Sequence, residues 1–251
     1  MVHIVGAGPG APDLITLRGA ELLKSADVVI YAGSLVNPEL LKLCRPDCEI
    51  HNSAKMTLEA VIEVIARAER EGKTTVRLHT GDPSLFGAIR EQMDEFEKLN
   101  IEYDVTPGVS SFCGAAAALG AEYTLPAVSQ SLIITRMAGR TPVPEREKLS
   151  AMSAPGASMV LFLSAGLLEG VTRELIQGAY TEDTPAAIVY KATWPEEKVV
   201  RCTVGTLARA AEENGIHETA LILVGDFLRG TVERSRLYDP GFTTAFREAE
   251  K

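Results

Sequence analysis

The run Val2-His3-Ile4-Val5-Gly6-Ala7-Gly8-Pro9-Gly10-Ala11-Pro12-Asp13 decides how the fold of this chain is interpreted. Its first four residues have the mostly apolar, β-branched composition of a buried strand, and a glycine-rich loop follows at once. Such a loop lets backbone approach a ligand closely, because glycine has no Cβ and adopts positive φ at little cost. The run therefore predicts a first strand with a ligand-binding loop at its carboxyl end.

Two common nucleotide-binding motifs do not fit this loop. A dinucleotide fingerprint needs an acidic residue at the end of the second strand, but here the second strand runs into Tyr31-Ala32-Gly33-Ser34. Pro9 and Pro12 also stiffen the loop. A Walker loop is excluded because no Gly-Lys-Ser/Thr follows the glycines. The loop is a ligand-site candidate of another kind.

Composition limits the classes of partner. The chain has 251 residues, of which 46% are hydrophobic and 24% charged, which suffices for one large core or two ordinary ones. The formal net charge of −9 repels nucleic acid, and no extended basic stripe offsets it. No apolar run approaches the ~20 residues that span a bilayer, and no signal-peptide pattern precedes the first strand. We expect a cytoplasmic protein without nucleic-acid or membrane partners.

The cysteines and histidines predict no metal site. Cys44, Cys48 and His51 are close in sequence, but a fourth ligand with zinc-type spacing is missing. Structural or incidental thiols are the favoured interpretation, and reduced, unpaired cysteines fit the cytosol.

Strand-like and helical segments alternate along the chain, which is typical of βαβ units around a mainly parallel sheet. The first set predicts strands near 2–5, 27–31, 74–79 and 101–105, and helices near 16–25, 57–71, 86–99 and 110–119. The second set predicts strands at 129–135, 159–163, 186–190, 199–203 and 220–224, and a helix near 205–214.

The fold class predicted is α/β, with two α/β domains that have mainly parallel or mixed sheets and an interdomain ligand cleft. Gly and Pro break the pattern between Gly120 and Pro126, as expected at a domain boundary. We assign residues 1–118 to an N-terminal domain, 119–230 to a C-terminal domain and 231–251 to a tail.

Two further loops follow predicted strands, and ligands of open α/β sheets bind at this edge. Thr80-Gly81-Asp82-Pro83 offers close approach and a hydrogen-bond acceptor, although an Asp cap with Pro opening a helix fits equally well. Pro107-Gly108-Val109-Ser110-Ser111 precedes a helix of small residues whose amino end presents free N–H groups. A serine cap with tight helix packing is the simpler interpretation of that second loop.

Two segments of the second half also carry candidate groups. Arg136 and Arg140 lie in a proline-rich loop after a strand, and guanidinium groups pair well with carboxylates, although a solvated loop is equally consistent. Tyr190-Lys191-Ala192-Thr193-Trp194-Pro195 ends another strand and holds the only tryptophan of the chain. Trp194 either lines the pocket of a flat ligand or, the commoner role, packs in a core.

In this order the motifs resemble those of the tetrapyrrole methyltransferase family, the class III S-adenosylmethionine-dependent methyltransferases, over about residues 1–228. The runs Tyr31–Val36, Gly139–Pro144 and Tyr190–Pro195 look most like those of members that methylate C11 of precorrin-4. The resemblance implies a homodimer that uses S-adenosylmethionine to methylate precorrin-4 or cobalt-precorrin-4 in cobalamin biosynthesis, with S-adenosylhomocysteine as product.

The resemblance also implies roles for individual residues. Residues 1–118 would form the tetrapyrrole side of the cleft and 119–230 the S-adenosylmethionine side. Cofactor contacts are implied at Pro9, Thr80, Gly81, Asp82, Leu85, Ser110, Ser111, Leu163 and Ala192. The substrate-binding candidates are Gly8, Ser34, Arg136, Arg140 and Trp194. No catalytic residue is identified, and the positioning candidates are Asp82, Tyr31 and Lys191.

The sequence departs from the family at two of these places. Leu163 stands where the family has Met, and Ala32 follows Tyr31 where some relatives carry an acid, so no carboxylate base is transferred. Three alternatives stay open: methylation of another precorrin carbon or of a protein residue, a nucleotide-binding regulator without turnover, and an NAD(P)-dependent oxidoreductase. The last is disfavoured by the missing acid after the second strand.

Overall fold

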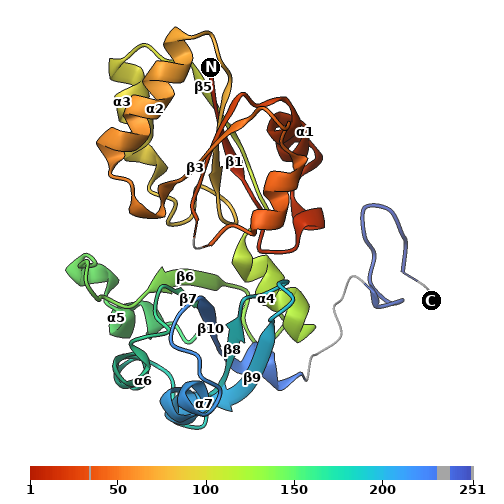
Figure 1. Ribbon diagram of the computed structural model, residues 1–251. Helices are drawn as coiled ribbons and strands as arrows, with labels where there is room; N and C mark the ends of the chain where they lie inside the picture. Colours follow the sequence, from red (N-terminus) through yellow and green to blue (C-terminus); the bar gives the residue numbers. More distant parts are fainter. Residues whose placement is uncertain (34, 231–237, 250–251) are drawn as a thin grey trace. The chain divides into compact units, whose positions relative to one another are not determined.

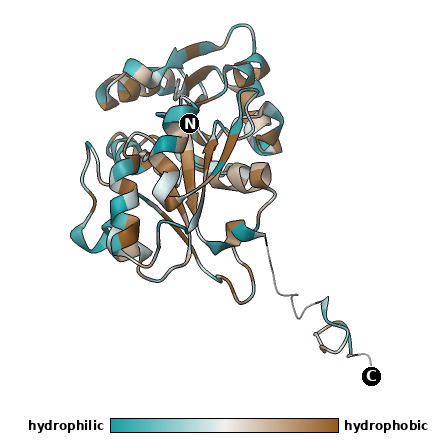
Figure 2. Cartoon of the chain, turned by 90° about the horizontal axis from the view of Figure 1, so that it is seen from below, coloured by the Kyte–Doolittle hydropathy of each residue, from teal (hydrophilic) through white to brown (hydrophobic). Residues whose placement is uncertain are grey.

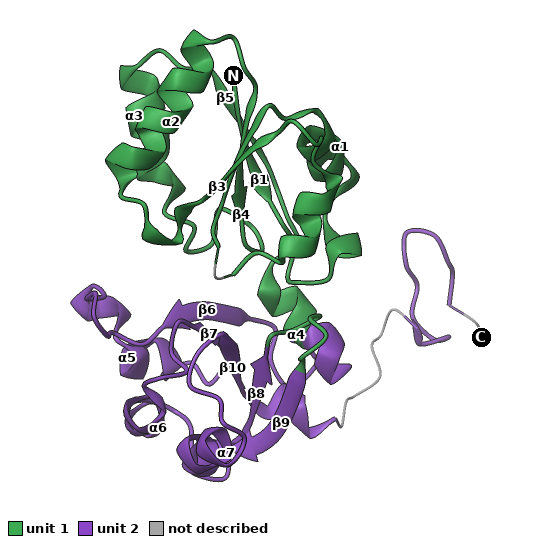
Figure 3. Cartoon of the chain, viewed as in Figure 1, with its two compact units in different colours: residues 1–115, 191–197 green, residues 116–190, 198–251 purple. Residues whose placement is uncertain are grey.

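The computed structural model describes residues 1–33, 35–230 and 238–249. The chain forms two compact units (Figure 3). Unit 1 contains Met1–Ala115 and Lys191–Glu197, and unit 2 contains Ala116–Tyr190 and Lys198–Lys251. The segment Lys191–Glu197 connects two strands of unit 2 in sequence but belongs to unit 1, whereas the linear division after residue 118 assigned it to the second domain.

Unit 1 is built on a five-stranded, wholly parallel sheet in the order β3-β2-β4-β1-β5. Its strands are β1 (Val2–Gly6), β2 (Val28–Tyr31), β3 (Glu49–Asn52), β4 (Thr75–His79) and β5 (Tyr103–Thr106). Its helices are α1 (Leu17–Ser25), α2 (Leu58–Arg70) and α3 (Ile89–Lys98), with the short 3₁₀ helices η1 (Pro12–Leu14), η2 (Pro38–Leu43) and η3 (Ser53–Lys55). Helix α4 (Ser111–Leu119) begins in unit 1 and ends in unit 2.

Helices cover both faces of this sheet, with α2 and α3 on one face and α1 on the other (Figure 1). Successive strand residues point to opposite faces, so Ile4 packs with Phe96 in one cluster while Val5 and Leu78 pack in the other. All four of these side chains are fully buried. Many strand residues are hydrophobic (brown in Figure 2), and the central strand β4 is buried along its whole length although it also contains Thr75, Arg77 and His79.

Unit 2 has a mixed five-stranded sheet in the order β6-β7-β10-β8-β9. Only β6 and β7 pair in parallel, and the other three pairings are antiparallel. The strands are β6 (Leu132–Arg136), β7 (Ser158–Phe162), β8 (Pro185–Tyr190), β9 (Lys198–Thr203) and β10 (Ala220–Val224). The helices are α5 (Leu149–Ser153), α6 (Leu168–Gln177) and α7 (Leu207–Glu213), with η4 (Glu145–Glu147), η5 (Val204–Thr206) and η6 (Asp226–Arg229). The prediction of two α/β parts with parallel or mixed sheets is confirmed.

Several boundaries differ from the prediction. Strand β3 and helices α5 and α6 were not predicted. Helix α3 begins at Ile89 instead of near residue 86, because Phe86 and Ala88 have positive φ (56° and 49°). Pro83 therefore does not open the helix. Among the helices that the structure describes, none is both long and apolar enough to cross a membrane.

Candidate active site

The loops that follow β1, β4 and β5 meet through their glycines at the carboxyl edge of the unit 1 sheet. A Cβ on Gly6 would lie 2.6 Å from the Gly108 Cα and from the Gly81 carbonyl oxygen, and a Cβ on Gly108 would overlap that same oxygen. The N–H of Gly81 donates to the carbonyl of Gly8 (2.9 Å), and the N–H of Gly8 donates back to Gly81 (3.3 Å). Main chain of three loops is thus in direct contact, which no residue with a side chain would permit.

Asp82 ties the second loop to the third. Its Oδ2 accepts from the backbone N–H of Gly108 (2.9 Å), and its Oδ1 accepts from the N–H (2.9 Å) and the hydroxyl of Ser84. Burial by itself raises the pKa of Asp82, but the hydrogen bonds from Ser84 and Gly108 outweigh it, and the pKa is lowered from its ordinary value of 3.8. The side chain stays ionised and holds the two loops together.

The predicted cofactor residues of unit 1 gather at the same edge. Thr80 directly follows β4, and the N–H of Leu85 donates to the Asp82 carbonyl (3.2 Å) within the same loop. Gly81 lies against Ser110 and Ser111, since a Cβ on it would be 3.5 Å from the Ser110 Cα. Ser111 begins α4, whose first turn leaves backbone N–H groups without helical partners.

The segment Lys191–Glu197 is hydrogen-bonded to the glycine-rich loop that follows β1. The indole N–H of Trp194 donates to the carbonyl of Pro9 (3.1 Å), and the Thr193 hydroxyl accepts from the N–H of Ala11 (2.9 Å). The ring of Trp194 lies so close to Gly10 that a Cβ there would overlap it. Trp194 was predicted as a substrate-binding residue, and the structure shows its indole N–H bound to the glycine-rich loop.

The remaining residues of this segment keep it in an unusual conformation. Lys191 and Thr193 have positive φ (46° and 69°), which is rare for residues with a side chain. The Lys191 Nζ lies 3.3 Å from a Glu196 carboxylate oxygen and 5.3 Å from the centre of the Trp194 ring. Ala192 between them is buried. Contacts within the segment therefore stabilise it, in addition to its hydrogen bonds to the glycine-rich loop.

The residues after β2 form another part of this edge. Tyr31 ends β2, and its carbonyl accepts from the Ser53 hydroxyl (3.0 Å). Gly33, which follows β2, packs against Asn52 at the end of β3, because a Cβ on Gly33 would overlap the Asn52 side chain. Ser34, a predicted substrate contact, lies outside the described residues.

In unit 2 the two candidate arginines differ sharply. The Arg136 guanidinium donates to three carbonyls in its own neighbourhood, those of Met137 (3.5 Å), Thr141 (3.2 Å) and Pro142 (2.6 Å). Arg136 therefore shapes the loop after β6. Arg140 is exposed at the other end of that loop, so its fork can reach a carboxylate in solution.

Leu163 and Ser164 directly follow β7, and they differ in exposure. Leu163 has a positive φ of 52° and a side chain that is 65% exposed. The neighbouring Ser164 is fully buried, and its hydroxyl donates to the Phe162 carbonyl (2.7 Å) and accepts from the N–H of Met137 (2.9 Å). Ser164 joins the ends of β6 and β7 and leaves Leu163 turned to solvent.

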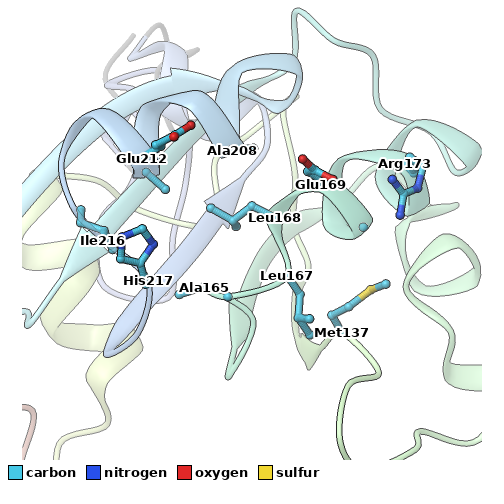
Figure 4. Close-up of a pocket in the computed structure, with 13 residues that line it drawn as sticks. Met137, Ala165, Leu167, Leu168, Glu169, Arg173, Ala208, Glu212, Ile216 and His217 are labelled. Atoms are coloured by element: carbon cyan, nitrogen blue, oxygen red, sulfur yellow. The ribbon is translucent and has the colours of Figure 1, made fainter.

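Unit 2 also contains a cavity of about 570 Å³ between α6, α7 and the loops that follow β6 and β7 (Figure 4). The buried apolar residues Leu168 and Ile216 line it, as do the exposed, charged residues Arg173 and Glu212. None of the predicted site residues that the structure describes lines it.

Sequence reasoning missed three buried polar residues near the unit 1 edge. Asn37, which precedes Pro38, donates from Nδ2 to the Gly10 carbonyl (2.9 Å). An Asn-Pro pair is a turn signal that could have pointed to it. Arg77 donates to Gln92 (3.0 Å), and burial lowers its pKa to about 10. Burial and the nearby Arg77 lower the pKa of His79 to about 3, so its imidazole is neutral.

The sequence profile described as Tetrapyrrole (Corrin/Porphyrin) Methylases matches residues 1–208. The chain therefore belongs to this family, and it is a methyltransferase. The cobalt-precorrin-4 C(11)-methyltransferase of Methanocaldococcus jannaschii is 49% identical over 251 residues, which cover 100% of this chain and 97% of the relative. The precorrin-4 C(11)-methyltransferase of Sinorhizobium sp is 48% identical over 248 residues, 98% of each chain.

Solved structures agree with this assignment. A cobalt-precorrin-4 methyltransferase of cobalamin biosynthesis matches with a TM-score of 0.88 and 48% identity, covering 90% of this chain and 95% of that one. The uroporphyrin-III C-methyltransferase of Thermus thermophilus, complexed with S-adenosylhomocysteine, matches with a TM-score of 0.76 and 25% identity over 93% of this chain and 95% of that one.

Proposed function

We propose that the chain transfers a methyl group from S-adenosylmethionine to C11 of precorrin-4 or cobalt-precorrin-4, in cobalamin biosynthesis. The observation that carries this proposal is the meeting of the loops after β1, β4 and β5, locked by Trp194 on Pro9. The names of the two relatives at 48 and 49% identity support the choice of substrate and carbon.

The polar groups at the unit 1 edge fit the chemistry of S-adenosylmethionine. The first turn of α4 offers N–H donors to a carboxylate, and the carbonyls of the glycine loops can accept from an ammonium or a hydroxyl. Because Asp82 already accepts from Gly108 and Ser84, we assign it to holding the loops as well as to the cofactor. The residues proposed to hold the cofactor are Pro9, Thr80, Gly81, Asp82, Leu85, Ser110, Ser111, Leu163 and Ala192.

The chemistry then needs little from individual side chains. S-adenosylmethionine, when bound, supplies an electrophilic methyl group on a good leaving group, and the enamine-like carbon of the macrocycle is already a nucleophile. The residues of the chain orient the two reactants and exclude water, and orientation alone contributes ~7–11 kcal/mol in well-placed systems. Arg140 binds an acetate or propionate arm of the macrocycle, because its exposed fork matches a carboxylate.

The finer predictions about assembly form part of this proposal. We propose a cytoplasmic homodimer with an interdomain cleft. Analytical ultracentrifugation tests the dimer, since a single species of the monomer mass, 26.9 kDa, would contradict it.

The activity is tested with S-adenosylmethionine that carries a ¹³C-labelled methyl group. Incubation with precorrin-4 and, separately, with cobalt-precorrin-4 is expected to give a product heavier by one labelled methylene unit, with the new carbon signal attached to C11. A label on another carbon identifies a different member of the family, and absence of label from both macrocycles overturns the proposal.

A further inference from the structure

The side chain of Thr193 joins the segment Lys191–Glu197 to two other parts of unit 1. Its hydroxyl accepts from the N–H of Ala11 in the glycine-rich loop (2.9 Å). Its methyl group lies against α4, because a Cβ on Gly114 would be 3.3 Å from that methyl carbon and 2.9 Å from the Pro9 Cβ. The glycine-rich loop, α4 and the segment therefore meet at this one side chain.

The backbone of Thr193 has a conformation that a β-branched residue rarely adopts. Its φ is 69°, in the left-handed region, and such residues persist only where their surroundings fix the backbone. The N–H of Thr193 donates to the Glu197 carboxylate (2.6 Å), and the N–H of Glu197 donates to the Trp194 carbonyl (3.0 Å). Glycine would adopt this φ without strain, but it would lose both contacts of the Thr193 side chain.

The three elements that meet at Thr193 also carry residues proposed to hold the cofactor. Pro9 lies in the glycine-rich loop, Ser110 and Ser111 lie at the start of α4, and Ala192 directly precedes Thr193. A change in the contacts of Thr193 would therefore disturb several of these residues at once.

We propose that Thr193 is a positioning residue for S-adenosylmethionine, an inference that rests on the proposed function. Its hydroxyl keeps the N–H of Ala11, and with it Pro9, in the conformation that binds the cofactor. Without this hydrogen bond the glycine-rich loop adopts other conformations for part of the time. The apparent affinity for the cofactor then falls in proportion to the fraction of molecules whose loop is competent to bind.

The test is isothermal titration calorimetry of the intact chain with S-adenosylhomocysteine, the product of the proposed reaction. Thr193→Val keeps the shape of the side chain but removes the hydroxyl, and it is expected to bind about fivefold more weakly than wild type, as the loss of one hydrogen bond predicts. Thr193→Ser keeps the hydroxyl and is expected to bind within about twofold of wild type. Thr193→Gly lacks the hydroxyl but suits the positive φ, so it is expected to bind as weakly as Thr193→Val and decides the question if that variant does not fold.

Thr184→Val is the matched control that separates positioning from a general loss of stability. Thr184 is buried directly before β8, and its hydroxyl accepts from the N–H of Thr181 at the same distance of 2.9 Å. Both valine variants are expected to lower the midpoint of urea unfolding by similar amounts, but only Thr193→Val is expected to weaken the binding of S-adenosylhomocysteine.

The outcomes distinguish the role of Thr193 from the proposed function. The role of Thr193 is overturned if wild type binds S-adenosylhomocysteine and Thr193→Val binds it equally well. It is also overturned if Thr193→Ser or Thr184→Val weakens binding as much as Thr193→Val does. Absence of binding to wild type would overturn the proposed function itself, and the role of Thr193 with it.

Discussion

The strand ends of the two units are built on different principles. In unit 1 the loops after β1 and β4 are joined backbone to backbone, and Asp82 ties the backbone of Gly108 to them. In unit 2 the loops after β6 and β7 are held by side chains, those of Arg136 and Ser164, and they leave other side chains exposed. Main-chain contacts therefore set the shape of the unit 1 edge. At the unit 2 edge, replacing a single side chain would change which groups are in contact.

The largest effect is expected where a side chain is forced into the glycine contact of unit 1. Gly108→Ala places a Cβ against the Gly81 carbonyl and the Gly6 Cα, and is expected to lower the free energy of unfolding by about 3 kcal/mol. Gly72→Ala is the control, because Gly72 has a positive φ of 68° but nothing within 4 Å of an added Cβ, and it is expected to cost about 1 kcal/mol. Urea unfolding measures both, and equal losses would contradict the close contact.

A smaller effect is expected at the carboxylate that joins the loops. In Asp82→Asn one oxygen becomes an amide N–H₂, which cannot accept from both Gly108 and Ser84, so the free energy of unfolding is expected to fall by about 2 kcal/mol near pH 7.

The pH dependence of Asp82→Asn sharpens this test. Because folding lowers the pKa of Asp82, its ionised form stabilises the native state fully above the unfolded value of 3.8, and this contribution is lost as the pH falls through the folded pKa. The stability difference between wild type and Asp82→Asn is therefore expected to shrink below pH 3.8. A difference that is constant with pH would show that the charge of Asp82 has no role.

Trp194→Phe tests the lock between the first loop and the segment Lys191–Glu197. It keeps an aromatic ring against Gly10 but removes the donor to the Pro9 carbonyl, and is expected to cost about 1 kcal/mol of stability. If the loop holds S-adenosylmethionine as proposed, calorimetry is expected to show about fivefold weaker binding. Unchanged stability and affinity would mean that the indole N–H does not hold the loop.

The smallest change in stability is expected for Arg140→Ala in unit 2. Arg140 is exposed, so the free energy of unfolding should stay within about 0.5 kcal/mol of wild type, while KM for the tetrapyrrole rises about tenfold and S-adenosylmethionine affinity is unchanged. Arg136→Ala is the matched variant and is expected to lose about 1 kcal/mol, because three loop carbonyls lose their donor. Equal loss of affinity for both ligands in Arg140→Ala would contradict a substrate role.

Local patterns predicted most elements of the sheets. The strand Ala220–Val224 was predicted at its observed bounds, because an uninterrupted apolar run is buried on both faces. Strand β3 was missed because it lies at the edge of the sheet and its sequence, Glu49–Asn52, contains only one apolar residue, Ile50. Helix α6 was missed although Leu168, Val171 and Leu175 recur at helical spacing.

The sequence by itself determined the alternation of strands and helices, the glycine-rich loops at strand ends and membership of the methylase family, because each depends on residues that are neighbours in the chain. The tertiary structure decided which groups meet: Asp82 with Gly108, Trp194 with Pro9 and Asn37 with Gly10. These pairs are 26, 185 and 27 residues apart. No local pattern encodes such contacts, since they depend on the order of strands in the sheet and on a connection from unit 2 that belongs to unit 1.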